Sequence, residues 1–188
     1  MRIVRPILIS LAAAGVAACD AVLDPDSPAD AYIDVTVGAA HTCALRGDGA
    51  LFCWGSNDWG QLGVPGPGGP EPRRVGGTDA FFIQADAGYF HTCALRWTDR
   101  GGEPWCWGQN TFGQLGDDTE VDRSSPVPVR STETFSEIRA GGAHTCGVTS
   151  DRYLLCWGRN RDGQLATGDF TPALRPHRLS GLALWQRV

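Results

Sequence analysis

The stretch His41-Thr42-Cys43-Ala44-Leu45 decides the fold because the chain contains two further versions of it. They are His91-Thr92-Cys93-Ala94-Leu95 and His144-Thr145-Cys146-Gly147-Val148, at spacings of 50 and 53 residues. A motif that recurs with such a period is typical of an architecture built from one repeated structural unit. The sequence therefore predicts a repeat protein.

Two more motifs follow each copy in the same order. One is Cys-Trp-Gly, and the other is Asn-x-x-Gly-Gln-Leu-Gly, whose third copy ends in Ala166. If the final glycine of this motif needs a positive φ, Ala166 strains its turn by about 1 kcal/mol. We predict structural roles within the repeat for the shared positions, which are His41, His91, His144, Trp54, Trp107, Trp157, Gly60, Gln61, Leu62, Gly113, Gln114, Leu115, Gly163, Gln164 and Leu165. The prediction includes histidines hydrogen-bonded inside their own repeat, tryptophans packed between repeats, and Gly-Gln-Leu-Gly as the turn between repeats.

Each repeat also predicts a small antiparallel sheet. Thr42 to Leu45 and Leu51 to Trp54 are short β-prone runs, and residues that tolerate positive φ connect them. In the second repeat, Asp99 to Pro104 is expected to enlarge this hairpin. One such sheet buries too little apolar surface to be stable alone, so the repeats must stack on one another.

Together, these motifs resemble the repeat of the regulator of chromosome condensation family over about residues 32 to 188. The resemblance implies an all-β fold, a β-propeller of seven antiparallel blades. We expect repeats at 32–80, 81–133 and 134–182 and the start of a fourth at 183–188, incomplete relative to a seven-bladed ring. Two alternatives stay open: self-association that completes a ring, or a truncated fragment of a longer protein.

Six of the seven cysteines form three pairs, one in each repeat. Cys43 and Cys53 are symmetric about Asp48, so a hairpin centred there places them opposite each other, about 4.5 to 5.5 Å apart at Cα. The same argument applies to the other two pairs, Cys146 with Cys156, and Cys93 with Cys106 across the enlarged hairpin. We predict three disulfides, and zinc binding or free thiols are the alternative.

The amino terminus predicts export. Arg2 and Arg5 precede an apolar run that ends in Val16-Ala17-Ala18-Cys19, which resembles the lipobox of bacterial lipoproteins. We expect residues 1–18 to be a signal peptide, Cys19 to carry lipid, and residues 19–31 to form an acidic, proline-containing tether. The protein would then be anchored by lipid to the bacterial cell envelope, in either membrane. The alternative is an ordinary signal peptide followed by an incidental cysteine.

Composition excludes several classes of chemistry. The chain has no lysine, which excludes Schiff-base and P-loop lysines, and its net charge of −5 disfavours nucleic acid as a partner. We find no catalytic motif and predict no cofactor and no metal. Two weak signals remain, a calcium site at Asp117, Asp118, Glu120 and Asp122, and an Asp-box of the sialidase type at Ser56-x-Asp58-x-Gly60.

The resemblance implies partner binding more than catalysis. The eukaryotic family can exchange guanine nucleotides on a small nuclear GTPase and contact chromatin, and similar secreted bacterial propellers include an inhibitor that covers β-lactamase. We therefore hypothesise a noncatalytic, lipid-anchored binding or scaffolding protein that recognises protein or glycan through loops such as Val64 to Gly77 and Asp117 to Ser125. The alternatives are a truncated fragment of a longer repeat protein and a sialidase-like or lyase-like enzyme.

Overall fold

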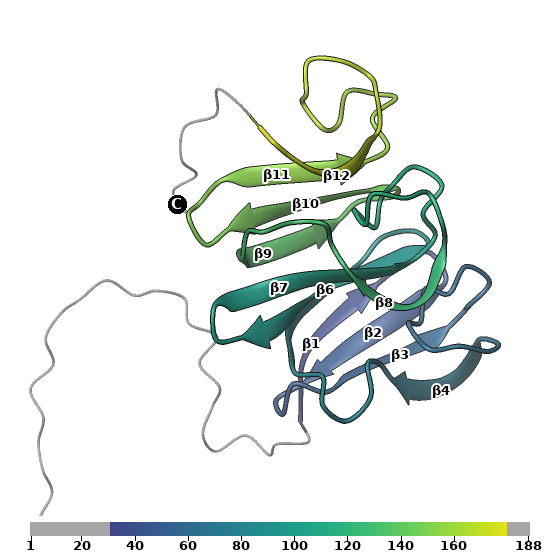
Figure 1. Cartoon of the computed structure of the whole chain (residues 1–188). Coiled ribbons are helices and arrows are strands. Elements are labelled where there is room, and N and C mark those ends of the chain that lie inside the picture. The colour runs from purple at the N-terminus through teal and green to yellow at the C-terminus, as the bar shows by residue number, and fades with distance from the viewer. Residues whose placement is uncertain (1–30, 180–188) are drawn as a thin grey trace, which may run out of the picture.

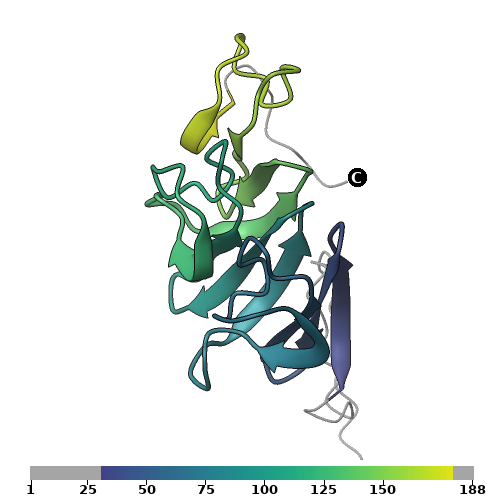
Figure 2. The ribbon, with the colours of Figure 1, turned by 90° about the vertical axis from the view of Figure 1, so that its right-hand side faces the viewer.

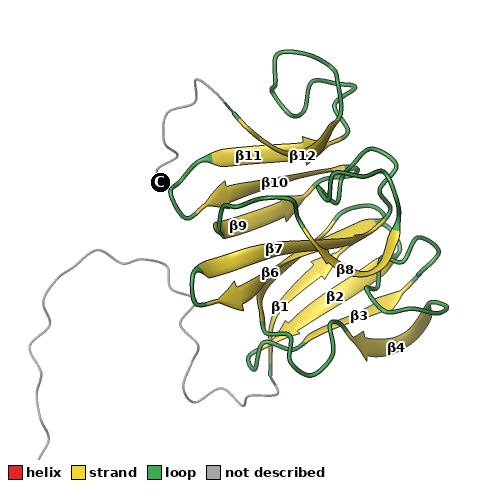
Figure 3. Cartoon of the chain, viewed as in Figure 1, coloured by secondary structure: helices red, strands yellow, loops and turns green. Residues whose placement is uncertain are grey.

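Every regular element in the described part of the chain, residues 31–179, is a β-strand (Figures 1 and 3). The computed structural model confirms the predicted all-β, antiparallel architecture. In chain order the strands are β1 (Tyr32–Val37), β2 (His41–Arg46), β3 (Leu51–Gly55), β4 (Gly69–Arg74), β5 (Phe82–Ala87), β6 (His91–Thr98), β7 (Gly101–Gly108), β8 (Arg123–Pro128), β9 (Phe135–Ala140), β10 (His144–Thr149), β11 (Leu154–Gly158) and β12 (Ala173–Arg178).

The strands form three blades of an incomplete propeller, which follow one another in space as they do in sequence (Figure 2). Blade 1 comprises β1 to β4, blade 2 comprises β5 to β8, and blade 3 comprises β9 to β12, each paired in sequence order. The first strands of successive blades contact one another, so β1, β5 and β9 lie on the inner side of the arc. A single pairing of Gly102 in β7 with Phe135 in β9 joins blades 2 and 3.

The central hairpin of each blade follows from its turn residues. In blade 1 Gly49 adopts a φ of 77°, and the Asp48 carboxylate accepts the Ala50 N–H at 3.1 Å. In blade 2 the hairpin is enlarged as expected, but through its strands and not through its loop. Residues 101–104 instead continue β7 and pair with β6 as far as Thr98 and Gly101, so the extra residues lengthen the two strands.

The cysteines pair within blades as three disulfides, Cys43–Cys53, Cys93–Cys106 and Cys146–Cys156. Each pair lies directly opposite in register on the two central strands of its blade, with Cα atoms 4.1 Å apart. The sulfur atoms are thus bonded to each other, and neither zinc nor free thiols occupy these positions.

The hydrophobic core lies between blades, because each cluster takes side chains from two of them. The cluster between blades 1 and 2 includes Leu45, Leu51, Leu62, Val75, Phe82, Ala85 and Trp107. The cluster between blades 2 and 3 includes Leu95, Leu115, Val129, Phe135, Ile138, Leu155 and Trp157. A blade therefore depends on its neighbour for burial, which is the physical reason that repeats occur in series.

Several expectations concern residues outside the described part of the chain. These are the signal peptide at 1–18, the lipid on Cys19, all but the last residue of the 19–31 tether, and the partial repeat at 183–188. Between residues 31 and 179, no helix is long and apolar enough to cross a membrane.

Candidate functional site

The recurring histidine bonds to a threonine of the next blade. His41 Nε2 lies 2.8 Å from Thr92 Oγ1, and Thr92 donates to the main-chain carbonyl of Gln61 at 2.9 Å. The same carbonyl accepts Trp107 Nε1–H at 2.9 Å. Because the threonine hydroxyl has one hydrogen and gives it to Gln61, His41 must donate from Nε2. This interblade network therefore requires a neutral histidine with its proton on Nε2.

Blades 2 and 3 share an equivalent network. His91 Nε2 lies 3.0 Å from Thr145 Oγ1, while Thr145 and Trp157 both donate to the carbonyl of Gln114 at 2.9 Å. The expectation that these histidines bond inside their own blade is wrong. They hold neighbouring blades together, and Trp107 and Trp157 lie at the same interfaces.

Burial lowers the pKa of His41 to about 4, and burial with smaller repulsion from His41 and His144 lowers the pKa of His91 to about 3. The Nδ1 atoms of both rings are buried and have no hydrogen-bond partner among the described residues. A second proton on either ring would therefore be buried without an acceptor. Neutral imidazole is the form that the folded protein holds.

The Asn-x-x-Gly-Gln-Leu-Gly motif folds one turn in each blade. Asn57 Oδ1 accepts the Leu62 N–H at 2.9 Å, and Gln61 Oε1 accepts the Trp59 N–H at 3.0 Å. The equivalent bonds recur in the other two blades. The turn connects the third and fourth strands of one blade, so its assignment as the turn between blades is wrong. Its glutamine carbonyl accepts the hydrogen bonds from the next blade, and its leucine belongs to the core between the two blades.

We expect Thr92→Val to lower the free energy of unfolding by about 1–3 kcal/mol, because it leaves the buried Nε2–H of His41 without an acceptor. The matched control is Thr42→Val, at the equivalent position of blade 1, where the hydroxyl makes no hydrogen bond with any residue from 31 to 179. Its effect should stay within about 0.5 kcal/mol. Urea denaturation of both variants measures the difference, and equal losses would contradict the interblade role.

The residues of the two weak signals, the calcium site and the Asp-box, make structural contacts. Asp117 pairs with Arg123 at 2.9 Å, Asp118 pairs with Arg175 of blade 3 at 2.7 Å, and Asp122 accepts the main-chain N–H of Asn110 at 2.7 Å. These carboxylates are directed to different partners, and no group of three or more potential ligands converges within residues 31–179.

Likewise, the Ser56 hydroxyl donates to Asp58 at 3.1 Å and accepts from Gln61 Nε2 at 3.1 Å, which supports the turn of blade 1. The residues of the expected Asp-box thus stabilise the turn of blade 1.

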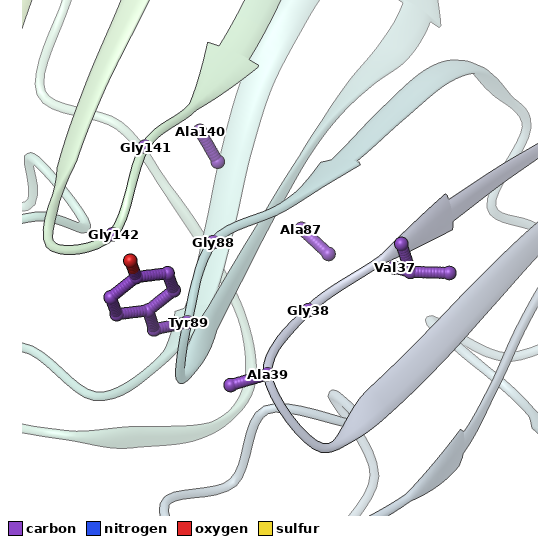
Figure 4. Close-up of a pocket in the computed structure, with 9 residues that line it drawn as sticks. All are labelled: Val37, Gly38, Ala39, Ala87, Gly88, Tyr89, Ala140, Gly141 and Gly142. Atoms are coloured by element: carbon purple, nitrogen blue, oxygen red, sulfur yellow. The ribbon is translucent and has the colours of Figure 1, made fainter.

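A shallow pocket of about 280 Å³ lies where the inner strands end (Figure 4). We call it the mouth. Equivalent residues of three blades line it, namely Val37, Gly38, Ala39, Ala87, Gly88, Tyr89, Ala140, Gly141 and Gly142. Main-chain bonds connect the blades here, since Ala39 N–H donates to Tyr89 O and Tyr89 N–H donates to Gly142 O, both at 3.2 Å. The mouth is therefore a backbone surface held in place by three blades.

An aromatic row borders the mouth. The Tyr89 and Phe90 rings lie 6.5 Å apart, and Phe90 lies 6.4 Å from Trp59 in the turn of blade 1. Tyr89 is 63% exposed and Trp59 41% exposed. The Tyr89 ring rests against Gly142, where an added Cβ would come within 3.0 Å of a ring carbon.

Tyr89 and Phe90 depart from the repeat. The equivalent residues are Ala39-Ala40 in blade 1 and Gly142-Ala143 in blade 3, so the architecture does not need aromatic side chains here. Sequence reasoning missed this site because it looked for what the repeats share. The available signal was the second repeat, because the two residues before its histidine differ from those of the other repeats.

Sequence comparison gives the same picture of the repeats. The regulator of chromosome condensation (RCC1) repeat matches residues 48–95 and 102–148, and a second profile of this repeat matches 32–61 and 135–164. The chain belongs to the RCC1 repeat family. Among its relatives, the ultraviolet-B receptor UVR8 of Arabidopsis thaliana is 29% identical over 157 residues, covering 81% of this chain and 35% of the receptor. The probable E3 ubiquitin-protein ligase HERC3 of Homo sapiens is 34% identical over 152 residues, covering 78% of this chain and 14% of the ligase.

Solved structures of RCC1-like proteins share the fold. Human WBSCR16 superimposes with a TM-score of 0.73 at 26% identity, over 83% of this chain and 42% of that protein. Prp20p of Saccharomyces cerevisiae, whose structure was described with its binding to Gsp1p and histones, gives a TM-score of 0.69 at 21% identity, over 80% of this chain and 38% of Prp20p. This RCC1 chain thus spans less than half of each of these four proteins.

Proposed function

We propose that this RCC1 repeat protein is a noncatalytic binding protein of the bacterial cell envelope, exported and anchored through lipid on Cys19. It recognises a protein partner through the mouth and the aromatic row of Trp59, Phe90 and Tyr89. The observation that carries the proposal is the exposure of Trp59 and Tyr89 beside a glycine-lined pocket.

The chemistry of the row suits a protein partner. Tyr and Trp are enriched at the energetic centres of protein interfaces, where a large rigid ring buries much area at little entropic cost. The Tyr89 main chain is fixed by its bonds to Ala39 and Gly142, so binding would order only the side chain. A preorganised surface of this kind loses little entropy on association.

The buried polar side chains support a noncatalytic role. His41, His91, Thr92 and Thr145 are all engaged between blades. A general base would need a reachable imidazole with a pKa near the working pH, whereas His41 and His91 are buried and have lowered pKa values. These four polar side chains thus serve the stacking of blades.

The relatives also favour protein recognition, since the Prp20p structures concern binding to Gsp1p, histones and Kap60. The hypothesis of a fragment of a longer repeat protein fits the share of each relative that is covered. The binding proposal does not depend on that hypothesis, because it concerns blades 1 to 3 alone.

The test is a photo-reactive phenylalanine analogue at position 89, in the protein expressed in its own host. We expect a discrete adduct with one protein, lost when Trp59→Ala is added. The matched control places the analogue at the exposed Thr132, which precedes β9 whereas the mouth follows it. Equal adducts at both positions, or none at position 89, would overturn the proposal.

Other outcomes separate the alternatives. A polydisperse adduct that glycosidases shorten would indicate a glycan ligand instead, and release of sugar by the purified protein would indicate an enzyme. Mass spectrometry of membrane-extracted protein tests the anchor, for which we expect acyl mass on an amino-terminal Cys19. A Cys19 without acyl mass would overturn the anchor and leave the binding site untouched.

A further inference from the structure

The chain enters the propeller at the end opposite the mouth. Tyr32, the first residue of β1, pairs with Arg46, the last residue of β2, and the Gly47 N–H donates to the carbonyl of Ala31 at 2.9 Å. The entry point therefore lies beside the turn of the β2–β3 hairpin, and the hairpins β6–β7 and β10–β11 turn at the same end of the molecule (Figure 1). We call this the hairpin end. The inner strands run from it to the mouth.

Two aromatic side chains are exposed at the hairpin end. Phe81, directly before β5, is 41% exposed, and Trp97 in β6 is 54% exposed. The Trp97 N–H donates to the Phe81 carbonyl at 2.8 Å, so the two residues are neighbours across β5 and β6. The Phe81 ring rests on Gly49 of the blade 1 hairpin, where an added Cβ would stand 2.5 Å from a ring carbon. The aromatic pair is thus held next to the entry point of the chain.

The repeat does not need aromatic side chains at these positions. In the register of the strands, Phe81 takes the place of an alanine in blade 1 and a threonine in blade 3, and Trp97 takes the place of a glycine and a serine. These equivalents are Ala31, Thr134, Gly47 and Ser150. Ile33 and Ile83, the second residues of β1 and β5, are 47% and 39% exposed and enlarge the apolar surface. An exposed apolar surface that the architecture does not require indicates a site of interaction.

The polar residues at the hairpin end suit the surface of a lipid bilayer. Arg100 and Arg152 lie in the hairpin turns of blades 2 and 3, are exposed, and form no ion pair with any residue from 31 to 179. Each adjoins an acidic residue, Asp99 or Asp151, so these turns carry no net charge. Tryptophan concentrates at the boundary between lipid headgroups and acyl chains, where one ring meets apolar and polar surroundings. The hairpin end therefore matches a zwitterionic lipid surface.

The position of the expected lipid on Cys19 agrees with this match. Residues 20 to 31 can span at most about 40 Å even when fully extended. A lipid on Cys19 would thus keep the hairpin end near the bilayer, with the mouth further away by the length of an inner strand. A tether of this length does not fix the orientation of the propeller. A contact of the protein surface with the bilayer is needed to fix it.

We propose that the hairpin end contacts phospholipid, with Phe81 and Trp97 inserted among the headgroups so that the mouth faces away from the bilayer. The inference rests on the proposed function, because it takes the lipid on Cys19 as the anchor. Burial of the two rings adds apolar contact to the anchor. The mouth and its aromatic row then stay accessible to a protein partner.

The test compares two phenylalanines of the whole protein in its own host. A photo-reactive phenylalanine analogue replaces Phe81 in one variant and Phe170 in the other. Phe170 is the matched control because it is 70% exposed and lies in the loop between β11 and β12, at the mouth end of blade 3. We expect mass spectrometry to find a phospholipid adduct on the peptide that contains position 81, in several-fold excess over the peptide that contains position 170.

A second comparison tests the cooperation of the two rings. Trp97→Ser, added to the variant with the analogue at position 81, should reduce the phospholipid adduct several-fold, whereas Phe170→Ser should leave it unchanged. The purified protein in phosphatidylcholine vesicles should give the same adduct at low and high salt, because salt screens charges and does not weaken apolar contact. An adduct that disappears at high salt would contradict the insertion of the rings.

The outcomes at position 81 decide the inference. A protein adduct there would overturn it and make the hairpin end a second protein interface. Equal lipid adducts at positions 81 and 170, or none at position 81, would overturn it as well. Acyl mass on Cys19 is measured in the same samples, and its absence would overturn the anchor and this inference together. The protein adduct at position 89 reports on the mouth separately, so a failed orientation is distinguishable from a failed binding site.

Discussion

Replacing Trp107 with alanine is expected to lower the free energy of unfolding by about 3–5 kcal/mol. The indole is fully buried between blades 1 and 2, its ring lies 6.3 Å from that of Phe82, and its N–H donates to the Gln61 carbonyl at 2.9 Å. The substitution thus leaves a large cavity and removes one of the two hydrogen bonds to that carbonyl. Both effects weaken the contact between blades 1 and 2, so the loss of stability should affect the whole molecule and not one blade alone.

Trp54→Ala is the matched control because it removes the same side chain from the same position of blade 1, where the indole is partly exposed. We expect less than half of the loss at Trp107, since only part of the apolar area is buried. Urea denaturation followed by far-ultraviolet circular dichroism measures both variants. Similar losses would show that the indole stabilises the interior of its own blade, which would contradict the interblade assignment.

The division of the chain into blades was predictable from the sequence, because each copy of the periodic motif specifies one blade. A hairpin centred on Asp48 also places Cys43 opposite Cys53, so the pairing of the cysteines follows from spacing alone. The enlargement of the second hairpin was also predictable, but the position of its extra residues was not. The additional residues of the second repeat lengthen β6 and β7 in register, and spacing does not distinguish a longer loop from two longer strands.

The histidine network could not be predicted from the period. His41 and Thr92 are 51 residues apart, and a repeat shows that each position has a constant role without showing which neighbour supplies its partner. The segment Val64 to Gly77 was expected to be a loop, and part of it is a strand. Pro70 and Pro72 suggest a loop, yet they lie in β4, an outer strand of blade 1, where proline is tolerated because one edge of the strand is unpaired.

Stability should fall steeply as the pH decreases from about 6.5 towards 4. An unfolded histidine titrates near pH 6.5, whereas burial lowers the pKa of His41 to about 4 and that of His91 to about 3 in the folded protein. Between these values the unfolded chain binds protons that the folded protein does not, so the free energy of unfolding decreases with falling pH. At pH 5 the loss relative to pH 8 is about 2 kcal/mol for each of the two histidines.

The acidic groups do not obscure this range. The hydrogen bond from Arg46 lowers the pKa of Asp48 below its ordinary value of 3.8, so the stability that this carboxylate contributes is complete at higher pH and is lost only below about pH 4. Urea denaturation between pH 8 and pH 5 therefore isolates the histidines. Burial also lowers the pKa of His144, which adds to the effect in the same direction.

His41→Gln separates titration from packing, because an amide N–H can donate towards Thr92 but takes up no proton in this range. The variant should be less stable than the wild type at pH 8, yet its stability should depend less on pH, with the uptake of protons on unfolding at pH 5 reduced by about one. The control is the same substitution, His177→Gln, at an exposed histidine outside the interblade networks. An unchanged slope in His41→Gln would mean that His41 is protonated in the folded protein. That state is incompatible with the structure, because the Thr92 hydroxyl gives its hydrogen to Gln61 and the buried Nδ1 of His41 has no acceptor among the described residues.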